Sequence, residues 1–150
     1  MMQQKKILLA VVIILGLGVL VFVLLNQSED RQAKSIVEEF YLYEQDGAFS
    51  ESWKLFHPKM EEKFNKGHYI QDRAHVFMNH FGVTTFSFEL GSVKKVKDWV
   101  MEEGTEAIGE AFVVPVYKTY KGKYGNFTIS QDVYATKVDG EWKILWDYNK

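Results

Sequence analysis

The polar side chains best spaced for chemistry lie in the segment "HYIQDRAHVFMNHFG". His68, Asp72, His75 and Asn79 recur there at intervals of four, three and four residues, which places them on one side of a helix. Imidazole and carboxylate groups in such a row could bind a metal ion or transfer protons. At about 100° per residue, however, the row points away from the apolar residues of the same segment. We therefore expect a solvated helix face, with no metal ion and no cofactor bound.

Two further candidates for catalysis lie in predicted strands. Asp147 follows Trp146, so the two side chains point to opposite faces and the carboxylate faces away from the core. The run "SVKK" that begins at Ser92 fits the Ser-x-x-Lys motif of a serine nucleophile. That motif belongs at the start of a helix, whereas this copy lies in a strand. We expect no catalytic residue, and hence no enzyme.

Aromatic side chains are the other group that could form a site. Phe, Tyr and Trp make up 15% of the chain, and rings at the open end of a curved sheet can either line a ligand pocket or fill it. The sequence leaves both possibilities open and favours filling. The candidates for lining such a pocket are Tyr41, Trp53, Phe56, Tyr117, Trp142, Trp146 and Tyr148.

The N-terminal segment differs in character from the rest. Residues 7–25 read "ILLAVVIILGLGVLVFVLL", without a charged side chain, and as a helix they would cover roughly 28 Å, close to the hydrocarbon thickness of a bilayer. A cleaved signal peptide is the alternative, but its apolar region is shorter and ends in an Ala-x-Ala-like site. Lysines precede the run and acidic residues follow it, so the positive-inside rule predicts an N-terminus in the cytoplasm. The predicted organisation is a cytoplasmic tip (1–6), a transmembrane anchor (7–25), a linker (26–32) and an extracytoplasmic domain (33–150).

Charge and cysteine content narrow the class of protein. The formal net charge is −2, or −4 once Lys5 and Lys6 are set aside, so nucleic acid is not an expected partner, because such binding needs concentrated positive charge. The chain has no cysteine, so an exported domain must be held by its apolar core, which is more typical of a Gram-positive bacterium. Two groups of lysines are expected on exposed strand surfaces: Lys94, Lys95 and Lys97, and Lys118, Lys121 and Lys123.

Apolar spacing predicts helices followed by strands. The helical period recurs in three units between Ala33 and Gly82, broken near Gly47 and at Pro58. Residues 83–148 alternate instead, with a bulge or bend at Gly91-Ser92 and an edge position or bulge at Pro115. Asp139-Gly140 predicts a tight hairpin turn, after which the last strand carries Trp142, Ile144 and Trp146. About three helices and four antiparallel strands predict an α+β fold whose closing strand faces the helices.

This order resembles the nuclear transport factor 2-like (cystatin-like) superfamily, in which helices pack on a curved antiparallel sheet to form a cone. More narrowly, residues 33–148 resemble the non-catalytic N-terminal domain of methicillin-resistance-type penicillin-binding proteins. The resemblance is carried by "FYLYEQDGAFSESWKLF", "YIQDRAHVFMNHFGV" with its Arg73, "VVPVYKT" and "DGEWKILWDY". It implies no catalytic role, because this sequence lacks the transpeptidase motifs that accompany the domain in those proteins.

The expected function is that of a non-enzymatic, single-pass membrane protein whose extracytoplasmic domain binds a cell-envelope protein, such as a component of wall synthesis. One alternative is an assembly subunit of a conjugation or type IV secretion-like channel, which would form homo-oligomers. Another is a small-molecule binder or isomerase that uses the aromatic pocket.

Overall fold

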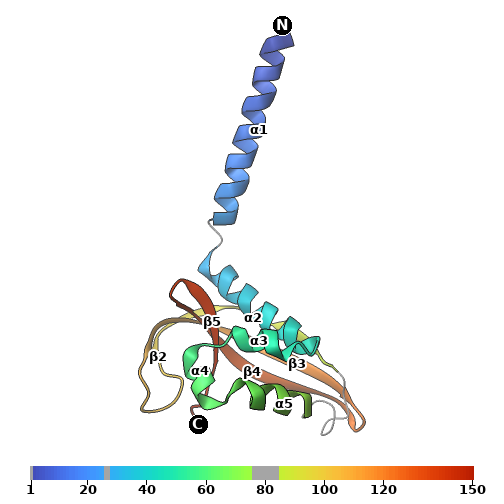
Figure 1. Ribbon diagram of the computed structural model, residues 1–150, viewed down its shortest axis with the longest axis vertical. Helices are drawn as coiled ribbons and strands as arrows, with labels where there is room; N and C mark the ends of the chain where they lie inside the picture. The colour runs from blue at the N-terminus through green and yellow to red at the C-terminus, as the bar shows by residue number, and fades with distance from the viewer. Residues whose placement is uncertain (1, 26–27, 76–84) are drawn as a thin grey trace.

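The computed structural model describes residues 2–25, 28–75 and 85–150. Its helices are α1 (Met2–Leu25), α2 (Glu29–Gln45), α3 (Phe49–Lys54), α4 (Pro58–Lys63) and α5 (Lys66–His75). Its strands are β1 (Ser87–Leu90), β2 (Lys94–Trp99), β3 (Ile108–Gly122), β4 (Gly125–Val138) and β5 (Glu141–Trp146). Figure 1 shows α1 projecting from a layer of helices that lies against the sheet.

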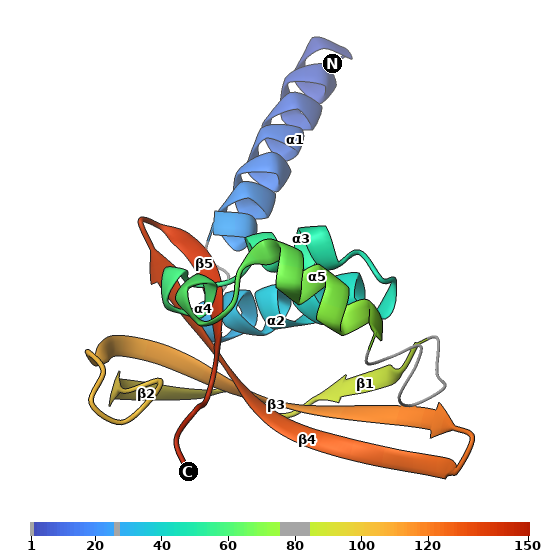
Figure 2. The same ribbon diagram turned by 60° about the horizontal axis from the view of Figure 1, so that its bottom comes forward.

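All five strands belong to one antiparallel sheet with the order β1-β3-β4-β5, in which β2 also pairs with β3. The helices α2, α3 and α5 lie over one face of this sheet (Figure 2). We call that face the inner face and the opposite one the outer face. The predicted α+β fold, with helices packed on an antiparallel sheet, is therefore confirmed, although the sheet has five strands rather than about four.

The extra strand arises from the bend predicted at Gly91-Ser92. The chain breaks there, so that β1 pairs with residues 116–119 of β3 and β2 pairs with residues 108–113. Pro115 lies in the middle of β3 opposite this break, where Gly91 donates its N–H to the Pro115 carbonyl at 2.8 Å. A Cβ on Gly91 would meet the proline ring at 3.1 Å, so glycine permits the close approach. The sequence predicts an edge position or a bulge for Pro115. The edge position is wrong, because β3 is central, and the break between β1 and β2 accommodates the missing N–H instead.

Two tight hairpins complete the sheet. The register joins Gly122 to Gly125 at the β3–β4 turn. At the β4–β5 turn, Asp139 and Gly140 have φ of 51° and 84°, which is the pair of positive values that a type I′ turn requires. The turn predicted at Asp139-Gly140 is confirmed.

The last strand lies inside the fold. Ile144 and Leu145 are fully buried, and β5 pairs with β4 from Val133 to Val138. Its other edge contacts the segment between α3 and α4, because Ile144 donates to the Leu55 carbonyl at 2.8 Å and accepts from the His57 N–H at 2.9 Å. This strand therefore ties the helical layer to the sheet.

The helix α1 stands apart from the rest of the fold (Figure 1). Its described large apolar side chains, Leu9 and those between Val11 and Val21, are 46–67% exposed. Within the described residues, no helix is found that has both the length and the apolar character needed to cross a membrane.

Candidate functional site

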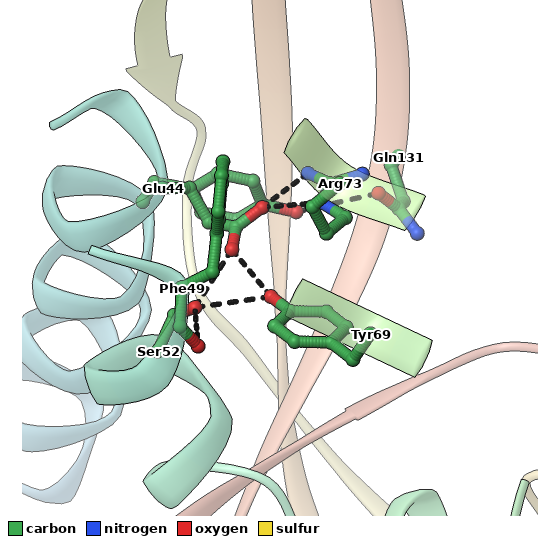
Figure 3. Close-up of polar contacts among 7 residues, drawn as sticks. Glu44, Phe49, Ser52, Tyr69, Arg73 and Gln131 are labelled. Atoms are coloured by element: carbon green, nitrogen blue, oxygen red, sulfur yellow. Dashed lines mark hydrogen bonds and ion pairs between the residues drawn. The ribbon is translucent and has the colours of Figure 1, made fainter. Parts of the chain in front are cut away.

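The most heavily bonded polar group of the inner face is the carboxylate of Glu44, in the last turn of α2. Its side chain is fully buried. Ser52 of α3 donates its hydroxyl to Glu44 Oε1 at 2.7 Å, and the Tyr69 hydroxyl of α5 donates to the same oxygen. Arg73 of α5 donates Nε to Oε2 at 2.6 Å and adds a second bond from Nη2. We call Glu44, Ser52, Tyr69 and Arg73 the inner polar cluster (Figure 3).

The inner polar cluster links three helices through one carboxylate. Burial works against the charge on Arg73, but the adjacent Glu44 outweighs it, so the pKa of the guanidinium is raised. Burial and the same carboxylate raise the pKa of Tyr69, which therefore stays protonated. A carboxylate offers about four acceptor positions, and four donors occupy them here. Glu44 is thus fully satisfied and has no free lone pair with which to act as a base.

Lys118 is a further charged side chain of the inner face, outside the inner polar cluster. It lies on β3 and is only 6% exposed, with Nζ at 5.4 Å from the centre of the Tyr41 ring. The Tyr41 hydroxyl in turn donates to Gln131 Oε1 at 3.3 Å. Burial, reinforced by the positive charge of Arg73, lowers the pKa of Lys118 to about 8. The expectation that Lys118 lies on an exposed strand surface is wrong, because its position on β3 faces the helices.

The sequence pattern contains a signal for the buried positions of both Glu44 and Lys118. Glu44 follows Val37 and Phe40 at helical spacing, so it falls on the apolar row of its own helix. Lys118 shares its strand parity with the buried Val116 and Tyr120. In both cases, a charged residue stands at a position where the pattern of the element requires an apolar one. Such a position indicates a buried charge.

Four of the seven aromatic candidates come together on the inner face: Tyr41, Trp53, Phe56 and Trp146. The ring of Phe56 lies 5.8 Å from that of Trp53 and 5.0 Å from that of Trp146, both edge to face. Tyr41 packs edge to face on Phe40 at 5.1 Å, and burial raises its pKa. The indole N–H of Trp146 has no acceptor in bonding geometry among the described residues.

The other three candidates lie elsewhere. Tyr117 is 43% exposed and belongs to the outer face, because its strand parity is opposite to that of Lys118. Tyr148 follows β5, donates its N–H to the Met101 carbonyl at 2.9 Å and contacts Lys63. Trp142 donates Nε1 to Gln32 at 3.0 Å. The structure therefore does not gather all seven residues in one pocket.

Trp142 instead lines a groove of about 430 Å³ near the start of α2. Its apolar part is formed by Ile108, Phe112 and Trp142. Its rim carries an ion-pair network in which Glu29 contacts Lys95 at 3.5 Å and Lys137 at 3.2 Å. We call this the α2 groove. It combines the half-buried Trp142 ring with charges of both signs, a composition that suits a polypeptide surface.

The histidine candidates cap a helix or lie on an exposed helix face. His57 caps α4, accepting the Lys59 N–H on Nδ1 at 3.1 Å, and burial lowers its pKa. His68, Asp72 and His75 are exposed on α5, as predicted for a solvated face, while Asn79 lies outside the described residues. No group of metal-binding side chains occurs among the residues that the structure describes.

No protein-family model matches this chain, and no curated protein matches it.

Proposed function

We propose that this chain is a non-enzymatic, membrane-anchored protein that displays a nuclear transport factor 2-like cone outside the cell and binds a cell-envelope protein. The observation that carries the proposal is α1. The described residues from Val11 to Val21 are all apolar or glycine and all exposed, and such a helix segment is stable only when something apolar surrounds it. A lipid bilayer provides that environment, with residues 1–6 in the cytoplasm and residues 33–150 outside.

The interior supports binding rather than catalysis. A general base needs a lone pair within reach of a substrate proton, whereas Glu44 is saturated by its own neighbours. The inner polar cluster is best explained as a structural tie between α2, α3 and α5. The α2 groove is the more suitable contact surface, because it is open and begins at Glu29, four residues after the end of α1.

A single labelling experiment tests the anchor and the partner together. The chain has no cysteine, so Glu106→Cys, on the rim of the α2 groove, offers one thiol to a membrane-impermeant, photoactivatable maleimide in intact cells. We expect labelling, followed on irradiation by a crosslink to an envelope protein. Gln4→Cys should stay unlabelled, and Tyr124→Cys, at the distant hairpin, should be labelled without giving that crosslink. Labelling of Gln4→Cys but not Glu106→Cys would contradict the topology, and crosslinks to cytoplasmic proteins alone would contradict the partner.

Lys118 favours a second candidate function, the binding of a small carboxylic acid at the inner face. Among the described residues, no carboxylate lies within ion-pair distance of the Lys118 Nζ. Glu44, on the same face, is paired with Arg73. A buried cation without a counter-charge is costly, and an acidic ligand would lower that cost. Tyr41 lies beside it, and the Tyr41 hydroxyl is bonded to Gln131.

Replacing Lys118 by methionine is therefore expected to stabilise the free protein. The pKa of Lys118 falls from 10.5 to about 8 on folding, so the unfolded chain binds more protons than the folded one between these two pH values. The cost of burying the charged lysine therefore applies fully below pH 8 and disappears as the pH approaches 10.5. We expect Lys118→Met to raise the free energy of unfolding at pH 7 by about 1–3 kcal/mol, and the gain to shrink as pH approaches 10.5. Urea unfolding at both pH values measures this, with Lys121→Met as the exposed control.

The ligand is tested with acetate and benzoate as probes. Either acid should raise the melting temperature of the wild-type protein and leave that of Lys118→Met unchanged. A Lys118→Met variant that is less stable than wild type at pH 7 would show that the lysine is paired in the native state.

A further inference from the structure

One edge of β4 pairs with no strand of the described residues over about half of its length. The strand pairs with β3 from Gly125 to Ala135, but β5 covers its other edge only from Val133 onward. Among the described residues, no strand pairs with that edge between Gly125 and Asp132. Figure 2 shows this part of β4 along the border of the sheet, beyond the helices.

The hairpin register identifies the free backbone groups. Gly122 and Gly125 flank a two-residue turn, so they form a hydrogen-bonded pair, and the pairs then alternate along the strands. Pro115 opposite Asp132 fits this alternation, because a proline can occupy only a position without a donated ladder bond. The N–H and C=O groups of Asn126, Thr128 and Ser130 consequently point away from β3, toward the open edge.

This edge lacks the usual protection against pairing. Natural edge strands are guarded by charges, prolines or bulges, whereas residues 126–131 read "NFTISQ", with neither a charge nor a proline. Ile129 is 39% exposed here. A six-residue segment of this composition readily forms additional strand pairs.

We propose that the open edge of β4 binds a second copy of this chain, antiparallel and centred on Thr128, so that two sheets become one. The free backbone groups require even-numbered residues to pair with even-numbered ones. When the pairing is centred on Thr128, Phe127 of each copy lies opposite Ile129 of the other, which gives two apolar pairs on the inner face. Centring on Phe127 would oppose Ile129 to Gly125, and centring on Ile129 would oppose Phe127 to Gln131, so both lose apolar pairs.

Charge and topology agree with this register. It sets Asp132 opposite Tyr124 of the other copy and therefore beside that copy's Lys123, an attractive pair at each end. The two-fold axis is perpendicular to the sheet, so both helical layers lie on the same side. Because α1 leaves from that layer (Figure 2), both anchors would enter one membrane. This last point rests on the proposed anchor, whereas the strand pairing does not.

A matched pair of variants tests the interface in the full chain. Thr119 and Thr128 are neighbours on the outer face, with their hydroxyl oxygens 2.8 Å apart, so lysine at either position removes the same hydrogen bond. Only at position 128 does the new charge meet its own copy across the axis. In detergent micelles, sedimentation should give a dimer for the wild type and for Thr119→Lys, and at least tenfold weaker association for Thr128→Lys. Equal dissociation constants for the two variants, or a monomeric wild type, would overturn the proposal, whatever the topology or envelope partner is.

Disulfide trapping tests the register. Residues opposite each other in a hydrogen-bonded antiparallel pair have Cα atoms about 5.5 Å apart, within the range that a disulfide spans. In membranes treated with copper phenanthroline, Thr128→Cys should form a covalent dimer, and Thr119→Cys should not. A Thr128→Cys disulfide to a different protein would assign the edge to another occupant and overturn self-pairing.

Discussion

Replacing Glu44 by alanine is expected to lower the free energy of unfolding by about 3–5 kcal/mol, which is the usual cost of breaking a buried ion pair from one side. The loss leaves Arg73 charged against the inner face, with the Ser52 and Tyr69 hydroxyls deprived of their common acceptor. Because a domain of this size has only about 5–15 kcal/mol in total, the variant should be close to unfolding at growth temperature.

The measurement is equilibrium unfolding in urea, with Glu38→Ala as the control. Glu38 lies on the same helix but is exposed, so its removal should change stability by less than about 0.5 kcal/mol. The double variant Glu44→Met, Arg73→Met removes both charges and should regain part of the loss. If Glu44→Ala unfolds at the same urea concentration as Glu38→Ala, the carboxylate does not tie the helices together.

Local rules in the sequence predicted most of the fold. A change of apolar period near residue 83 separated helices from strands, and Asp139-Gly140 fixed the last hairpin, because both signals depend only on neighbouring residues. The bend at Gly91-Ser92 was also visible. Its consequence, two strands sharing the edge of β3 with Pro115 opposite the gap, depends on a pairing across some 25 residues and could not be predicted from the strand alone.

The inner polar cluster illustrates the same limit. Glu44 and Arg73 are separated by 29 positions, and each residue alone has the character of a surface charge. Their attraction becomes decisive only after three helices have been packed together. Lys118 resembles the neighbouring lysines in charge, but its strand parity is that of the buried Val116 and Tyr120, and parity decides which face of the sheet it occupies. The predicted aromatic pocket is wrong for Tyr117 for the same reason, since Tyr117 has the strand parity of the outer face.

Removing residues 141–150 is expected to abolish cooperative unfolding. The deletion takes away β5, whose Ile144 bonds to Leu55 and His57 on one side while the strand pairs with β4 on the other. It would expose Val133 and Ala135, which are fully buried, and would remove the Trp146 ring from contact with Phe40 and Phe56. The summed loss exceeds the marginal stability of a domain of this size.

A graded series separates loss of the strand from loss of a single side chain. Ile144→Ala should cost about 2–5 kcal/mol, as cavities in a core usually do, yet leave a cooperative transition that near-ultraviolet circular dichroism can follow. Removing only Asn149 and Lys150 should preserve the transition as well, because both lie beyond β5. A chain that ends at Gly140 and melts at the same temperature as the full chain would mean that the helices and the remaining strands form the domain without the closing strand, and the assigned core would then be wrong.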